Sequence, residues 1–280
     1  MITIAGAFLH FDTIQKILKE NNFIELFEKF GQKLCVYDGV NNLPWNGGRM
    51  NKDCPGKFNE DQLKVYNSQG IGVFLCYTNP VIDYSMREPY NLIDKLYEND
   101  LNGIILINKG LYTILKRKYP NLRLRYSISG WDRSTDIKDY NIFKIQNSYE
   151  MFAPKIEWLF NREYYNTYDL NKSEVMLNIG CRFGCPFFKA HYRMMALANE
   201  SEDYAMCVKR CYSLDRDDAP HPNLHFTGRF NQEDILEALR IGYTNFKITG
   251  RELKQRSFEK EIKFYLNEIL KALIKFNKIL

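Results

Sequence analysis

The chain has 280 residues, of which 45 % are hydrophobic, and it carries a formal net charge of +5. Its longest apolar runs, such as residues 71–77 and 103–107, have the length of a strand and fall far short of a membrane span. The first residues lack the basic segment and long apolar core of a signal peptide. These features predict a soluble, cytoplasmic protein without membrane insertion, and the mild positive charge permits an anionic ligand or RNA as partner.

The first 30 residues predict a helical lead-in. Apolar side chains recur at helical spacing over residues 11–20 and again over residues 22–29. A buried-type strand is predicted over residues 33–38, and a loop rich in turn-forming residues follows over residues 39–57. We expect the lead-in to cover the bottom of whatever fold the strand begins.

From residue 33 onward, strand-like and helix-like stretches alternate. The predicted strands cover residues 33–38, 72–77, 103–107, 122–128, 141–145, 155–160, 174–179 and 245–248. The predicted helices cover residues 89–98, 111–118, 134–139, 149–152, 163–169, 234–240 and 258–276. Eight strand–helix units indicate a single α/β domain of the (β/α)8 TIM-like type, with the barrel over 33–250 and a closing helix over 252–280. An open doubly wound sheet is the alternative, although no dinucleotide-binding glycine fingerprint follows the strand at 33–38.

Polar residues follow nearly every predicted strand, at the end where barrels place their chemistry. Converging arginines would favour a carboxylate or phosphate, although a single arginine also fits a structural salt bridge. Acid–base work needs a carboxyl group near the same place. The predicted substrate-binding residues are Asn46, Arg49, Arg162 and Arg251, with Arg133 as a further arginine at a strand end, and the predicted acid–base residues are Asp38 and Glu163.

Four of the seven cysteines form two pairs, Cys181-x3-Cys185 and Cys207-x3-Cys211, with 21 residues between the pairs. Four thiolates suit either a [4Fe–4S] cluster or tetrahedral Zn²⁺, and the spacing alone does not choose between them. Four unrelated buried thiols are the remaining alternative.

The other cysteines and the histidines carry weaker expectations. Cys35 and Cys76 lie in apolar strand-like runs and are predicted core residues, while Cys54 lies in a loop. His191, ten residues past the first cysteine, is predicted to contact substrate or to transfer a proton rather than to bind the metal. The loop histidines His221 and His225 fit ordinary polar surface positions.

Several stretches resemble the collagenase-like U-type peptidase family. They are the strand and turn Lys247-Ile-Thr-Gly-Arg251, the element Leu159-Phe-Asn-Arg-Glu163, and the cysteine region that runs from Asn178 to Tyr192. Thr249 stands where that family usually has an acidic residue, and the cysteine spacing here is more compressed than is typical of it. The resemblance covers about residues 70–255.

This resemblance implies an α/β barrel and an iron–sulfur enzyme. Members were first described as peptidases, and several hydroxylate RNA bases or ubiquinone precursors without O2, with four cysteines holding the cluster. Three alternatives stay open at this point: an iron–sulfur hydroxylase, a zinc-dependent peptidase-like hydrolase, and a metal-bearing partner subunit of a heterodimer.

Overall fold

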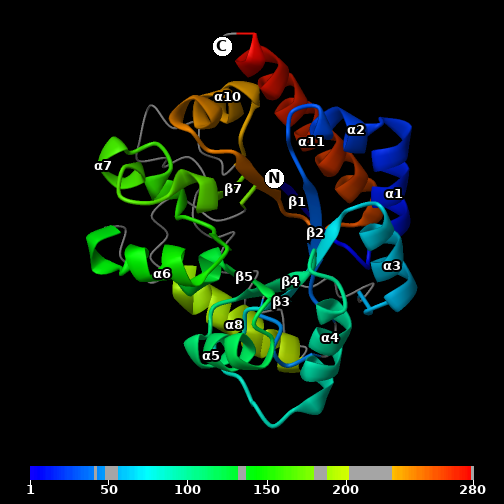
Figure 1. Cartoon of the computed structure of the whole chain (residues 1–280), viewed down its shortest axis with the longest axis vertical. Helices are drawn as coiled ribbons and strands as arrows, with labels where there is room; N and C mark the ends of the chain where they lie inside the picture. The colour runs from blue at the N-terminus through cyan, green and yellow to red at the C-terminus, as the bar shows by residue number, and fades with distance from the viewer. Residues whose placement is uncertain (41–42, 48–55, 132–136, 180–187, 202–228, 279–280) are drawn as a thin grey trace.

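The computed structural model describes residues 1–40, 43–47, 56–131, 137–179, 188–201 and 229–278. Within them, eight strands form one sheet in which every neighbouring pair is parallel, in the order β6-β5-β4-β3-β2-β1-β8-β7. A parallel bridge between Phe152 and Ser173 joins the two outer strands, so the sheet nearly closes on itself. The predicted (β/α)8 barrel is therefore confirmed (Figure 1).

The strands are short and buried, as expected where both faces of a sheet are covered. They are β1 Ile2–Ala5, β2 Leu34–Asp38, β3 Gly72–Tyr77, β4 Gly103–Leu106, β5 Arg123–Tyr126, β6 Met151–Phe152, β7 Glu174–Met176 and β8 Asn245–Ile248. The side chains alternate between a large core beneath the helices and a smaller cluster inside the barrel, which contains Ala5, Cys35, Tyr37, Phe74, Cys76 and Ile105.

Helices surround the ring of strands in Figure 1. The described α-helices are α1 Phe11–Glu20, α2 Phe23–Glu28, α3 Glu60–Ser68, α4 Arg87–Tyr97, α5 Lys109–Lys118, α6 Ile142–Ser148, α7 Arg162–Tyr165, α8 Phe188–Ser201, α10 Gln232–Ile241 and α11 Gln255–Asn277. Four short 3-10 turns are η1 Ile128–Gly130, η2 Ile137–Asp139, η3 Ile156–Trp158 and η4 Leu170–Lys172. In this described part of the chain, no helix combines the length and apolarity that a membrane crossing requires.

The predicted helical lead-in over residues 1–30 is correct for α1 and α2 but wrong for its first residues. Ile2–Ala5 is a barrel strand that pairs with β2 on one side and β8 on the other. It lies before the strand–helix alternation that located other four-residue strands such as β4 and β8, so only its pairing partners identify it as a strand. The predicted first strand is therefore the second, and the barrel begins at the start of the chain.

Two further predicted strands, 141–145 and 155–160, are wrong, although the count of eight is right. Asn141 caps α6 by accepting a hydrogen bond from the backbone N–H of Lys144, so the first stretch is helical. The second contains η3, where Trp158 packs edge-on against Trp131 at a centroid distance of 5.0 Å. The true β6 has only two residues, Met151–Phe152, which were predicted as part of a helical turn.

Candidate functional site

Three of the predicted site residues, Asp38, Asn46 and Arg251, meet at the C-terminal ends of β2 and β8. Asp38 is the last residue of β2, and Arg251 follows β8 by three residues. Gly39 lies close to the side chains of Asn46 and Arg251. A Cβ atom at this glycine would be 2.5 Å from Asn46 Oδ1 and 2.7 Å from Arg251 Nη1. The three side chains are at most 8 % exposed, so the group forms a buried polar mouth at one end of the barrel.

Asp38 holds the loop that follows β1. Its carboxylate accepts hydrogen bonds from the backbone N–H groups of Phe8 at 3.0 Å, Leu9 at 3.2 Å and Gly39 at 2.9 Å. Burial raises the pKa of Asp38 above its ordinary value, although Arg251 and the three N–H donors oppose that rise. The carboxyl group thus ties two neighbouring loops of the mouth together.

Cys76 and Tyr37 extend this group into the barrel. The Arg251 guanidinium hydrogen-bonds the Cys76 thiol, and the burial of Cys76 raises its pKa despite the cation beside it. Cys76 is a buried free thiol, as predicted, but its contact with Arg251 was not anticipated. The strand register could have indicated that Cys76 faces the barrel interior. Phe74 pairs with Tyr37 of β2, and Cys76 lies two residues further along β3, on the same face of the sheet.

The segment that carries Asn46 is fixed against the end of β3. Asn79 donates its backbone N–H to the Trp45 carbonyl at 3.0 Å and its side-chain N–H to the Pro44 carbonyl at 2.6 Å. A Cβ atom at Gly47 would collide with the backbone carbonyl of Thr78, so only glycine allows this approach. Asn46 is therefore held by backbone contacts on both of its sides.

The cysteine-bearing excursion, residues 180–228, begins and ends beside this mouth. Asn178 donates to the Thr249 carbonyl at 3.0 Å and accepts from the Thr249 N–H at 2.7 Å, two residues before Arg251. Asn178 also forms an antiparallel bridge with Arg229, and Phe230 N–H donates to the Leu177 carbonyl at 2.8 Å. The chain thus leaves β7 and returns to it at the same point.

The remaining predicted site residues fall into two groups. Arg162 and Glu163 are exposed at the start of α7, and His191 is half-buried on α8, a helix that packs against η1 after β5. The other predicted residues lie outside the described part of the chain: Arg49, Cys54, Arg133, Cys181, Cys185, Cys207, Cys211, His221 and His225. Of the predicted residues that the structure describes, only Asp38, Asn46 and Arg251 are therefore brought together.

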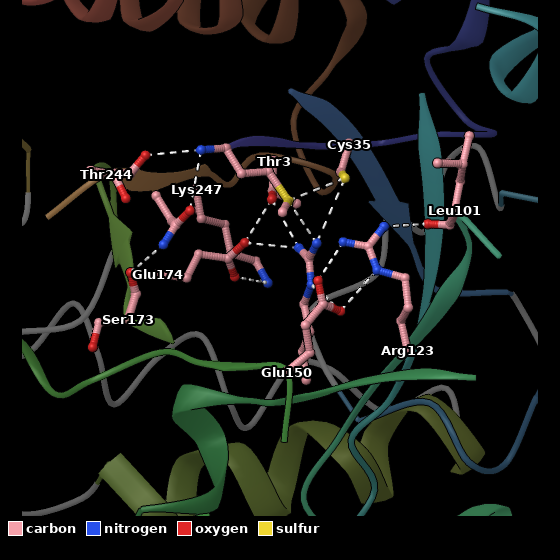
Figure 2. Close-up of polar contacts among 12 residues, drawn as sticks. Thr3, Cys35, Leu101, Arg123, Glu150, Ser173, Glu174, Thr244 and Lys247 are labelled. Atoms are coloured by element: carbon pink, nitrogen blue, oxygen red, sulfur yellow. Dashed lines mark hydrogen bonds and ion pairs between the residues drawn. The ribbon is translucent and has the colours of Figure 1, made fainter. Parts of the chain in front are cut away.

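A second buried polar group fills the barrel toward the N-terminal ends of β1 and β7, and Figure 2 shows its contacts. Glu174 accepts from Thr3 Oγ1 at 2.6 Å and from Arg125 Nη1 at 3.1 Å, and its other oxygen pairs with Lys247 Nζ at 3.3 Å. Lys247 Nζ also lies 4.2 Å from the centroid of the Tyr37 ring. This interior network was missed in the sequence because its members are scattered over four strands.

The electrostatics of this network favour the charged state of its carboxylate. Burial alone would raise the pKa of Glu174, but Lys247 and Arg125 together hold it below its ordinary value. Arg125 also lies 3.8 Å from Glu150, which forms a close ion pair with Arg123. Each charge in the interior network therefore faces an opposite charge.

The fold and these two buried groups define a (β/α)8-barrel protein with a polar mouth at the C-terminal ends of its strands. No family model matches the sequence, and no curated protein matches it. Among solved structures, the chain is similar to one described as "The Structure of the U32 Peptidase Mk0906". The identity is 11 %, the TM-score is 0.47, and the match covers 77 % of this chain and 84 % of that chain. A likeness at this level says nothing about activity.

Proposed function

We propose that this protein is an iron–sulfur enzyme that modifies an anionic substrate at the C-terminal mouth of its barrel. The observation that carries the proposal is the position of the cysteine-bearing excursion, whose two ends meet at Asn178 and Arg229 beside the turn that carries Arg251. The proposed metal centre and the proposed anion-binding group thus belong to segments that follow neighbouring strands, β7 and β8.

Arg251 and Asn46 supply the binding chemistry. A guanidinium offers a planar fork of donors that matches a carboxylate or a phosphate, and an amide adds donor and acceptor groups beside it. Both side chains approach the backbone of Gly39 and therefore lie close together. Both are buried, so little water reaches them. We therefore expect the substrate to carry a carboxylate or phosphate group, on a small aromatic molecule or on RNA.

The donor set fits the proposed cofactor. Cys181, Cys185, Cys207 and Cys211 offer four thiolates within one excursion, the ligand number of a [4Fe–4S] cluster and equally of tetrahedral Zn²⁺. The two cysteines inside the barrel, Cys35 and Cys76, are buried among core side chains and are not part of this set. The sequence resemblance to the collagenase-like U-type peptidase family favours the cluster over zinc.

The roles of the residues follow from their contacts. A [4Fe–4S] cluster, when bound by the four thiolates, would supply electron transfer to or from the substrate. Arg251 would bind the substrate anion, and Asp38 would hold the β1 loop in place through its three backbone hydrogen bonds. His191, half-buried on α8 within the excursion, is our candidate for proton transfer.

The test is the iron and acid-labile sulfide content of protein purified without oxygen. We expect a brown protein with about four irons and four sulfides per chain. The variant C181S should lose them, and the matched variant C76S should retain them because Cys76 lies in the interior cluster. A colourless, iron-free protein that contains zinc would instead support the peptidase-like hydrolase.

A further inference from the structure

His10 is a buried histidine of the mouth that sequence reasoning did not single out. It ends the loop that follows β1, the same loop whose amides at Phe8 and Leu9 bind Asp38. Its ring stacks on Phe258 of α11 with centroids 3.9 Å apart and an interplanar angle of 14°. The side chain thus lies between the β1 loop and the first turns of the closing helix.

The backbone around His10 is shaped to admit this ring. Gly6 has a φ of +82°, and a Cβ atom there would be 2.9 Å from His10 Cδ2 and 3.1 Å from Phe258 Cε2. Glycine is therefore required at this position for two reasons, the left-handed backbone and the close approach of both rings. The stack is a built-in feature of the β1 loop rather than a chance contact.

His10 also reaches the turn that carries Arg251. Its ring donates a hydrogen bond to the backbone carbonyl of Leu253, and Leu253 N–H donates in turn to the Gly250 carbonyl at 2.9 Å. The other ring nitrogen, Nε2, is buried without a hydrogen-bond partner among the described residues, so the donor is Nδ1. Gly250 has a φ of +134°, which makes the turn after β8 a left-handed one.

We propose that His10 is a positioning residue that fixes the turn Gly250–Leu253 and thereby places Arg251 in the mouth. The inference rests on the proposed anion-binding role of Arg251, because His10 acts on the substrate only through that side chain. Two ties then align the loops: Asp38 holds the β1 loop, and the imidazole of that loop holds the β8 turn. Removal of the second tie should free Arg251 without dismantling the barrel.

Two amide substitutions separate hydrogen bonding from simple packing. In H10N the side-chain amide nitrogen takes the place of Nδ1, whereas in H10Q it takes the place of Nε2. In H10F the ring can still stack on Phe258 but has no donor. Each variant would be compared with wild type by hydrogen exchange over residues 249–258 and by calorimetric titration with inorganic phosphate. The exchange of α3, which packs against β3, serves as the internal control.

We expect H10F and H10Q to exchange about tenfold faster over residues 251–254 and to bind phosphate about tenfold more weakly, the effect of one hydrogen bond. H10N should behave as wild type, and α3 should not change in any variant. Unchanged exchange in both H10F and H10Q, or equal exchange in H10N and H10Q, would overturn the proposal. Wild-type protein that fails to bind phosphate would count against the anion site alone, because the exchange data still decide the role of His10.

Discussion

The two ends of the barrel interior use buried charge in different ways. Toward the N-terminal ends of the strands, Glu174 is in contact with Thr3, Arg125 and Lys247, so one carboxylate faces two cations. At the C-terminal mouth, the Asp38 carboxylate is instead bonded to three backbone N–H groups, and Arg251 contacts a thiol. The first group links strand side chains to one another, whereas the Asp38 carboxylate of the second group binds loop backbone.

This difference separates a structural network from a functional one. The partners of Glu174 are side chains on three other strands, so these contacts hold strands to one another. Charges that hold loops at the C-terminal face set the shape of the surface where barrels bind their substrates. We therefore assign the Glu174 network to stability and the Asp38–Arg251 group to ligand binding.

The largest expected effect is the removal of the Glu174 carboxylate. In E174A the buried cations Arg125 and Lys247 lose their shared counter-charge, which should lower the free energy of unfolding by about 3–5 kcal/mol. The matched variant E150Q removes a carboxylate that is 29 % exposed and should cost about 1 kcal/mol. Urea unfolding measures both. Equal losses in the two variants would show that the interior network has no special role in stability.

A smaller effect is expected at the mouth from G39A. The new methyl group would lie 2.5 Å from Asn46 Oδ1 and 2.7 Å from Arg251 Nη1, so both side chains must move, at a cost of about 1–3 kcal/mol. Phosphate affinity should fall by at least about tenfold, because the pair that would bind the anion is displaced. Calorimetric titration of the folded variant measures this loss.

The matched control for that variant is G56A. Gly56 lies beside the Asp38 carboxylate, but a Cβ atom there would be 3.4 Å from Asp38 Oδ2, an acceptable contact. This variant should therefore bind phosphate as wild type does. If G39A and G56A had the same affinity, the pairing of Asn46 with Arg251 would not be the basis of binding.

The smallest expected effect is a difference in pH dependence between the two groups. The pKa of Glu174 is lowered in the folded state, so its contribution to stability is present above its ordinary value of 4.5 and is lost as the pH falls through the folded pKa. The pKa of Asp38 is raised above 3.8, so its contribution has the opposite sign and is lost as the pH rises through the folded pKa.

Urea unfolding between about pH 3 and pH 7 can separate these contributions. E174Q should flatten the loss of stability at acid pH, and D38N should leave that loss intact. If D38N removed the acid-induced loss instead, the two carboxyl groups would have the reverse assignment.

Much of the barrel could be predicted from sequence because its longer elements carry their own periodicity. The strand at residues 245–248 was located to the residue, and the apolar stripe of α11 was evident over residues 258–276. The strand β6 could not be found this way, since two residues show no period. The strand β1 was missed because it lies before the strand–helix alternation that located the other four-residue strands, β4 and β8. Their identity depends on pairing across the closed sheet.

The site was predictable in part because some of its residues follow strands that the sequence pattern locates. Asp38 and Arg251 follow well-defined strands, so strand ends located them, and Asn46 lies in the loop after the same strand as Asp38. His10 was missed because it follows β1, the strand that had been assigned to a helical lead-in. Glu174, Arg125 and Lys247 were missed because only the closed barrel brings their strands together.

The most direct test of the central claim is an anomalous difference map at the iron edge, from crystals grown without oxygen in the presence of phosphate. We expect a strong iron peak beyond the C-terminal ends of β7 and β8, on the side where Asn178 and Arg229 meet, and phosphate at Arg251. A map without an iron peak, or with the metal at the N-terminal end of the barrel, would contradict it.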